Sequence, residues 1–228
     1  MKPVRIRISE VLMRRGLSWI MSMVLLAGFL VIERAPDTVA AVSTPSPLVV
    51  IDPGHGGWDP GAVRGAVYEK SLTLAVASKL GMFLQQHGIR VYYTRSRDMA
   101  LASTVFSDLS QRASLANRLG ATVLVSIHVN TESTGTMAGP IVYFTQSTAS
   151  SYPLALAINR HLAGLAARQH SPRPIRQWVL LASHMPAVNV EIGFLSHSAD
   201  AARLQAPWYQ TRLAARIAEG ITSYLGYH

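Results

Sequence analysis

Three short apolar runs, each ending close to a turn signal, form the clearest pattern along the chain. They are residues 47–52 (PLVVID), 121–129 (ATVLVSIHV) and 187–192 (AVNVEI). Runs of this length that lack strict polar alternation and are rich in β-branched residues are typical of strands buried on both faces. Proline and glycine follow the first run, and the third lies between Pro186 and Gly193. The pattern therefore predicts three core strands that each run into a loop.

Segments with helical spacing separate these strands. In residues 69–87 the apolar side chains of Leu72, Val76, Leu80 and Leu84 recur every four residues, which predicts an amphipathic helix. The same reasoning predicts strands at 89–94 and 141–145, a strand-like run at 177–182, and helices at 109–119, 154–169 and 205–225. Alternating strands and helices without internal repeats predict a single α/β domain, with a largely parallel central sheet flanked by helices.

Four residues stand where such a fold concentrates its chemistry. His55 follows the first run, His128 lies near the end of the second, and Glu191 lies near the end of the third. In open α/β sheets, binding and catalytic groups gather at the carboxyl ends of the strands, so these three side chains are expected to converge. Glu69 opens the helix at 69–87, where a carboxylate interacts favourably with the helix dipole.

Together these side chains match the needs of a catalytic zinc ion. Such an ion takes three nitrogen or oxygen ligands from the protein and leaves a fourth position for water. His55, Glu69 and His128 supply that set. Glu191 is then available as a general base for the water. The sequence thus predicts one Zn²⁺ at the carboxyl ends of the strands of a hydrolase.

The neighbours of these residues suggest supporting roles. Asp52 and Asn130 lie beside predicted ligands and could orient them from a second shell. Gly54, Gly56 and Gly57 flank His55 and would let the loop approach the metal and substrate closely, although an ordinary tight turn explains them equally well.

Each residue also has a purely structural interpretation. Glu69 alone fits a helix start, and a histidine in an apolar strand such as His128 is often a hydrogen-bonded core residue. Glu191 is harder to explain this way, because a charged carboxylate in an apolar strand is costly unless it is paired or functional. His184 lies in the turn before the third run, and its distance from the site is not fixed by the sequence.

Longer motifs around these residues resemble those of a known family. They are IDPGHGGWDPGAV at 51–63, EKSLTLAVASKL from position 69, RASLAN at 112–117, SIHVN from position 126 and PAVNVEIGFLSHSAD at 186–200. Over residues 47–226 the chain resembles the zinc-dependent N-acetylmuramoyl-L-alanine amidases. The resemblance implies zinc ligands at His55, Glu69 and His128 and a catalytic Glu191. It also implies cleavage of the amide between the lactyl group of muramic acid and L-alanine in peptidoglycan.

Two positions depart from the family pattern. Asn189 stands where an aliphatic residue is commoner, and His197 stands where the family usually has asparagine. Neither is a predicted ligand, so the implied chemistry is unchanged.

Within the family, the chain resembles the germination-specific amidases of spore-forming bacteria. That resemblance implies removal of whole stem peptides, so that a deacetylase partner can form muramic lactam in the spore cortex. It places the enzyme in the forespore intermembrane space. The alternatives are a general cell-wall amidase in cell separation or turnover, and a zinc peptidase that cuts within the stem peptide. A non-catalytic binding module would be expected to have lost one of the four residues, and all four are present.

The amino-terminal region has the layout of an export signal. Five basic residues, the last of them Arg15, precede an uncharged, mostly apolar stretch at 16–32. The stretch is at the short edge for spanning a bilayer, and VAA at 39–41 fits a cleavage site, but we slightly favour an uncleaved anchor. We therefore expect residues 1–45 to be a signal peptide or signal anchor with a linker, and residues 46–228 to be the catalytic domain. The enzyme would be extracytoplasmic, either secreted or anchored on the outer face of the membrane.

Charge and cysteine content narrow the remaining choices. The chain has a net charge of +9, and residues 1–34, with six basic and two acidic side chains, leave +5 for the rest. A basic surface attracts anionic wall polymers or lipid head groups. Nucleic acid is not an expected partner, since no nucleic-acid-binding motif accompanies the charge. The absence of cysteine excludes disulfides and thiolate zinc ligands.

Overall fold

The computed structural model describes residues 46–166 and 168–227. The predicted export signal at 1–45, including the apolar stretch at 16–32, lies outside this part. Within it, no helix is both long enough and apolar enough to cross a bilayer.

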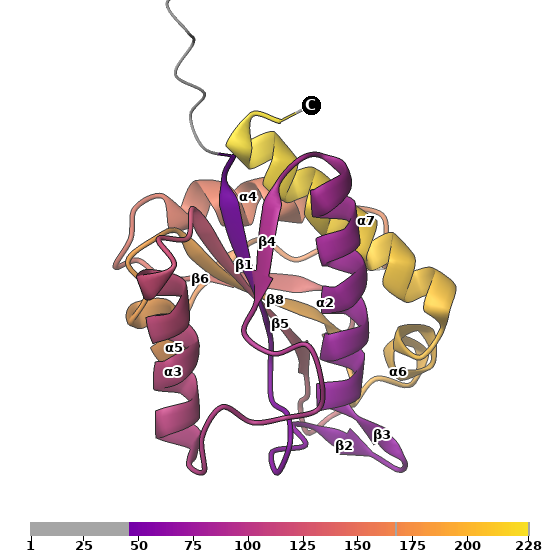
Figure 1. Ribbon diagram of the computed structural model, residues 1–228. Coiled ribbons are helices and arrows are strands. Elements are labelled where there is room, and N and C mark those ends of the chain that lie inside the picture. The colour runs from indigo at the N-terminus through magenta and orange to yellow at the C-terminus, as the bar shows by residue number, and fades with distance from the viewer. Residues whose placement is uncertain (1–45, 167, 228) are drawn as a thin grey trace, which may run out of the picture. The chain divides into compact units, whose positions relative to one another are not determined.

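The centre of the described part is a six-stranded sheet (Figure 1). In spatial order its strands are β4 (Arg90–Tyr93), β1 (Leu48–Pro53), β5 (Val123–Asn130), β8 (Ala187–Phe194), β6 (Ile141–Phe144) and β7 (Arg173–Pro174). The first four are parallel, β6 runs antiparallel to β8, and β7 is parallel to β6. A small hairpin of β2 (Val63–Arg64) and β3 (Val67–Tyr68) lies outside the sheet. The predicted fold class, a largely parallel sheet in one α/β domain, is confirmed.

Helices cover both faces of the sheet (Figure 1). The first face carries α2 (Glu69–Gln86), α4 (Ser151–Leu162) and α7 (Pro207–Leu225), and the second carries α3 (Val105–Arg118) and α5 (Trp178–Leu181). The short helix α6 (Ser198–Leu204) follows β8. The α/β layers thus leave the carboxyl ends of the parallel strands free to build a site.

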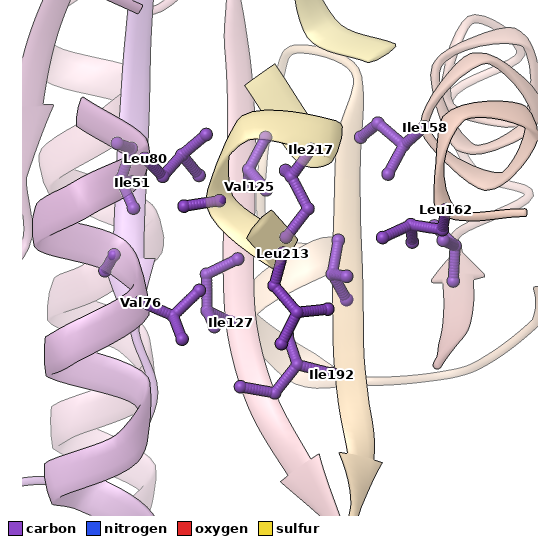
Figure 2. Close-up of a cluster of buried hydrophobic side chains, with 14 of the residues drawn as sticks. Ile51, Val76, Leu80, Val125, Ile127, Ile158, Leu162, Ile192, Leu213 and Ile217 are labelled. Atoms are coloured by element: carbon purple, nitrogen blue, oxygen red, sulfur yellow. The ribbon is translucent and has the colours of Figure 1, made fainter. Parts of the chain in front are cut away.

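The two faces of the sheet differ in polarity because side chains alternate along each strand. On the first face Ile51, Val125, Ile127 and Ile192 pack against α2, α4 and α7, as Figure 2 shows. On the second face the core is apolar only near the amino ends of the strands, where it includes Val50, Leu124 and Ala187. Toward the carboxyl ends, the residues that follow on this face are polar: Asp52, Ser126, His128, Asn189 and Glu191.

Several predicted boundaries needed correction. The run at 177–182 was expected to be strand-like, but it forms the helical turn α5 with Val179 and Leu180 buried. A short continuous apolar run does not distinguish a buried helical turn from a buried strand. The final helix, predicted at 205–225, begins two residues later as α7, at Pro207, which lacks a backbone N–H and suits a first helical position. The short helix α6 before it was not predicted.

Candidate active site

His55 lies in the loop after β1 with a left-handed backbone, at φ 62°. Its neighbour Gly54 faces the imidazole of His128 so closely that any side chain at position 54 would collide with the ring. Gly61 is similarly restricted, because a Cβ there would come 2.6 Å from Glu69 Oε2. These glycines allow the loop to bring His55 against His128, with ring centroids 4.9 Å apart.

The carboxylate of Glu69 lies between the two histidines. It belongs to the first residue of α2 and is 4% exposed. Its Oε1 lies 3.1 Å from His128 Nδ1 and 3.2 Å from His55 Nε2, and it accepts a 2.9 Å hydrogen bond from the Val129 N–H. Its Oε2 accepts a 2.8 Å bond from the Ala62 N–H. Two backbone donors therefore fix the carboxylate so that one oxygen faces both imidazoles.

The donor atoms of His55, Glu69 and His128 fit a single metal ion. One ligand atom from each residue lies within 4.8 Å of the others. Ligands about 2 Å from a tetrahedral ion are separated by roughly 3–3.5 Å, close to the two nitrogen–oxygen distances at Glu69. Two imidazole nitrogens and one carboxylate oxygen also form a donor set that zinc prefers and that leaves a coordination position open. The structure thus brings together the three residues that the sequence singled out as ligands.

Electrostatics at this cluster favour a bound cation. Burial opposes a charge on His55, but hydrogen bonds and charges from Glu69 and Asp59 outweigh it and raise its pKa to about 9. Burial likewise opposes the charge on Glu69, but the two histidines lower its pKa well below the usual range. The carboxylate is therefore ionised and attracts positive charge, whether that charge is a proton on an imidazole or a metal ion.

Asp59 holds the ring of His55 from behind. Its Oδ2 lies 2.7 Å from His55 Nδ1, and its Oδ1 accepts a hydrogen bond from the Gly61 N–H. A carboxylate on one ring nitrogen fixes the tautomer and directs the other nitrogen toward the metal position. Asp59 was not predicted as a site residue from the sequence. The spacing of four residues from His55 was a weak signal, because the two are joined by a loop.

Glu191 lies on β8 directly opposite His128 on β5. Its Oε1 accepts a 3.0 Å hydrogen bond from Asn189 Nδ2, and its Oε2 is buried without a hydrogen-bond partner among the described residues. Burial is the main cause of a raised pKa for Glu191. The nearby Glu69 charge adds to the rise, and His128 opposes it. A carboxyl group that exchanges a proton nearer to neutral pH is suited to general acid–base catalysis.

Two buried arginines hold the loop that carries His55. Arg112 donates to the carbonyl oxygens of Pro53 and His55 at 2.8 and 2.9 Å, and Arg95 donates to those of Pro53 and Gly54 at 2.9 and 2.8 Å. Three consecutive carbonyl groups are thus fixed by side chains that are at most 2% exposed. Arg112 opens the RASLAN motif, but the motif by itself indicated no role for it, because arginine is usually exposed.

Asp52 acts on this loop through Arg112. Its carboxylate pairs with Arg112 at 2.8 Å and accepts hydrogen bonds from Thr94 and Ser126. Burial opposes its ionisation, but the Arg112 charge lowers its pKa. Among the described hydrogen bonds, none joins Asp52 directly to a predicted ligand.

Asn130, the other expected orienting residue, also lies apart from the ligand atoms. Its side chain accepts a hydrogen bond from the Thr131 N–H, and its carbonyl oxygen accepts one from the Leu195 N–H. Asn130 therefore shapes the end of β5, and no described hydrogen bond connects its side chain to the ligands.

Two hollows open beside the cluster. One, of about 190 Å³, is lined by His55, His128, Trp58 and residues of α3. The other, of about 320 Å³, lies on the Glu69 side and is lined by Arg64 among others. His184 lies just before the start of β8, at the opposite end of that strand from Glu191, and belongs to neither hollow.

The fold and the site define a hydrolase of the α/β class with a histidine–glutamate–histidine cluster. The sequence pattern of a known family, N-acetylmuramoyl-L-alanine amidase (Amidase_3), matches residues 49–223. The chain belongs to this family, as its motifs indicated.

Similar proteins agree with this assignment. The germination-specific N-acetylmuramoyl-L-alanine amidase of Bacillus subtilis is 33% identical over 187 residues, which cover 78% of this chain and 79% of that protein. The catalytic domain of the amidase CwlV from Bacillus (Paenibacillus) polymyxa var. colistinus is 35% identical, with a TM-score of 0.74 over 80% of this chain and 99% of that one. The CwlD amidase from Clostridioides difficile, solved in complex with the GerS lipoprotein, is 27% identical, with a TM-score of 0.76 over 79% and 99% of the two chains.

Proposed function

We propose that this amidase hydrolyses the bond between the lactyl group of muramic acid and L-alanine with the help of one zinc ion. His55, Glu69 and His128 would hold the ion, and Glu191 would act as the general base and then the general acid. The observation that carries this proposal is the position of Glu191 directly opposite His128, with one carboxylate oxygen buried and without a hydrogen-bond partner among the described residues.

The chain's own residues divide the work between positioning and proton transfer. A bound zinc ion supplies Lewis-acid polarisation of the scissile carbonyl and lowers the pKa of water. Asp59, Arg95 and Arg112 keep His55 in place, and two backbone N–H groups keep Glu69 in place. Glu191 takes a proton from the attacking water and delivers it to the departing amine of L-alanine.

For the biological setting we favour the spore cortex. Relatives include the germination-specific and sporulation-specific amidases of Bacillus subtilis, which are 33% and 30% identical to this chain. Removal of whole stem peptides would prepare muramic acid for a deacetylase partner that forms the lactam. A general wall amidase is the second candidate, because the Bacillus subtilis amidase LytC is also 30% identical, although the chain spans only 41% of it.

The site of action follows from the substrate, since peptidoglycan lies outside the cytoplasmic membrane. We infer that the apolar stretch at 16–32 directs export and either is cleaved or anchors the enzyme on the outer face. The forespore intermembrane space is the corresponding compartment in a spore former. A protein partner fits this setting, because the CwlD relative was solved with a lipoprotein.

Product analysis tests the proposal. The full-length chain, loaded with zinc, is incubated with peptidoglycan, and the products are identified by mass spectrometry beside two variants. Glu191→Gln removes the proposed base, and Glu219→Gln changes a half-exposed glutamate on α7 as the matched control.

Free stem peptides beginning with L-alanine, released by the wild type and Glu219→Gln but not by Glu191→Gln, would support the amidase. Products cut inside the stem would identify a peptidase instead. Normal release by Glu191→Gln would contradict the role given to that residue.

A further inference from the structure

Three large aromatic side chains are exposed beside the active site. Trp58 is 51% exposed, Phe106 is 62% exposed and Trp178 is 43% exposed. We call these three residues the aromatic rim. Exposed apolar side chains that gather next to a functional hollow mark a binding surface more often than chance exposure does.

Contacts within the protein hold the rim in place. The Trp58 indole N–H donates a 2.8 Å hydrogen bond to the carbonyl oxygen of Ala102, and the Trp178 indole N–H donates a 3.0 Å bond to Ser110 Oγ. The rings of Phe106 and Trp178 lie 5.0 Å apart at 45°. These rings therefore offer a preformed surface, and binding to it needs little ordering of side chains.

The rim is continuous with the hollow that contains the histidines. Trp58 lines the 190 Å³ hollow directly. Phe106 follows Val105 at the start of α3, Trp178 follows Gln177 at the start of α5, and both Val105 and Gln177 line the same hollow. The aromatic rim and the hollow that contains the histidines thus form one continuous surface.

We propose that the aromatic rim binds the sugar rings of the glycan strand on either side of the reacting muramic acid. This inference rests on the proposed function. A pyranose ring has apolar C–H faces that pack on exposed aromatic rings. The lactyl group joins the scissile amide to a sugar, so this sugar lies only a few bonds from the reacting amide. When the amide is at the His55–His128 pair, the sugar must therefore lie close to the hollow.

Two other occupants fit the rim less well. The stem peptide begins with alanine, whose methyl group offers little to an aromatic pair, and the second hollow on the Glu69 side, lined by Arg64, provides a separate place for it. A lipid bilayer on the rim would cover the hollow that the substrate must enter. The position of the rim at the mouth of the site therefore favours the glycan.

Binding measurements with the separate parts of the substrate test the inference. Calorimetry on the full-length, zinc-loaded chain uses stem-free glycan strands, free stem peptide and vesicles of anionic phospholipid as three probes. The double variant Phe106→Ala/Trp178→Ala removes the tilted pair of rings. Trp208→Ala is the matched control, because Trp208 is also 62% exposed and packs against one aromatic neighbour, Tyr209, but lies on α7.

The double variant is expected to bind glycan strands about tenfold more weakly or worse, as is usual when central aromatic contacts are truncated. Its KM for glycan-attached stems should rise by a similar factor with little change in kcat, and Trp208→Ala should behave like the wild type. Unchanged glycan binding in the double variant would overturn the inference. A loss confined to the stem peptide or to vesicles would overturn it as well.

Cleavage of a small muramoyl-L-alanine substrate separates this outcome from failure of the proposed function. If the wild type cleaves that substrate but the double variant still binds glycan normally, only the role of the rim is wrong. If the wild type does not cleave it under zinc loading, the proposed function fails, whatever the rim binds.

Discussion

Glu191 on β8 and His128 on β5 are direct partners in the parallel ladder that joins these strands. The proposed base and one proposed ligand therefore stand on two adjacent, hydrogen-bonded strands at the centre of the sheet. Sites built on strands are held more precisely than sites built on loops. His55, which does lie on a loop, is instead held by Asp59 and by arginine contacts to its backbone.

The raised pKa of Glu191 predicts the acid limb of the pH profile. A general base works only when ionised, so kcat/KM should fall as the pH drops through the pKa of Glu191. Burial raises that pKa above the ordinary value of 4.5, so the fall should begin at a higher pH than for a solvated glutamate. The measurement is kcat/KM for a small muramoyl-L-alanine substrate at saturating zinc between pH 4 and 9. A profile that stays flat down to pH 4.5 would contradict this role.

Asn189 should affect the position of the acid limb in the pH profile of kcat/KM. Its side chain is 1% exposed and donates to Glu191 Oε1, which favours the ionised carboxylate. Asn189→Leu should move the acid limb to higher pH by about one pH unit, since a hydrogen bond to a charged group contributes roughly 1.5–3 kcal/mol. Leucine is similar in size, so the fold should persist. An unshifted limb in a variant with a normal melting temperature would show that Asn189 only packs.

Asp59 should control metal affinity. Asp59→Asn removes the charge that orients His55 while keeping the size of the side chain, and losses of an outer carboxylate of this kind weaken metal binding about 10–100-fold. Competition with a chromophoric chelator measures the affinity. Asp98→Asn is the control, because Asp98 is exposed in the same region but pairs with Lys70 rather than with a histidine. Equal affinities for the two variants would rule out the orienting role of Asp59.

Arg112 should stabilise the whole fold, in addition to holding the loop that carries His55. Arg112→Met leaves the buried Asp52 and Asp108 carboxylates without their partner, which is expected to lower the free energy of unfolding by about 3–5 kcal/mol. The exposed Arg118 lies on the same helix and serves as the control. Arg118→Met should change the free energy of unfolding by less than about 0.5 kcal/mol. Urea denaturation measures both.

The difference in unfolding free energy between the wild type and Arg112→Met should depend on pH, which tests whether the pair with Asp52 is its source. The folded pKa of Asp52 is lowered, so its contribution is complete above the ordinary value of 3.8 and is lost as the pH falls through the lowered value. The gap between wild type and Arg112→Met should therefore narrow below about pH 4. A constant gap would mean that the pair with Asp52 is not the source of the stability.

Removal of the metal should abolish activity, but the protein should remain folded. The main apolar core lies on the first face of the sheet and includes none of the proposed ligands, so the metal-free protein should stay folded. Zinc should raise the melting temperature, and by more as its concentration rises further above its Kd. Magnesium should not, because two imidazoles and one carboxylate suit zinc rather than a hard, octahedral ion. Recovery of activity with magnesium alone would refute the assignment.

The sequence by itself determined the parts of the site that depend on local pattern. Apolar runs that end in turn signals located β1, β5 and β8 to within two residues, and helical spacing located α2. Once strands and helix were placed, the rule that parallel strands present chemistry at their carboxyl ends was enough to group His55, His128 and Glu191. Glu69, at the start of the helix, was added because it completes the ligand set of a zinc ion. Local periodicity carries this information because it follows from backbone geometry alone.

Only the tertiary structure decided which side chains support that group. Asp59 and Arg95 have no distinguishing spacing, and each acquires its role from a contact made across a loop or across the fold. Asp52 was expected to touch a ligand, yet it reaches the His55 loop through Arg112, which lies 60 positions away in the sequence. The aromatic rim likewise unites residues from three distant segments. Burial and long-range hydrogen bonding depend on how the layers pack, and a single sequence does not encode them in a periodic form.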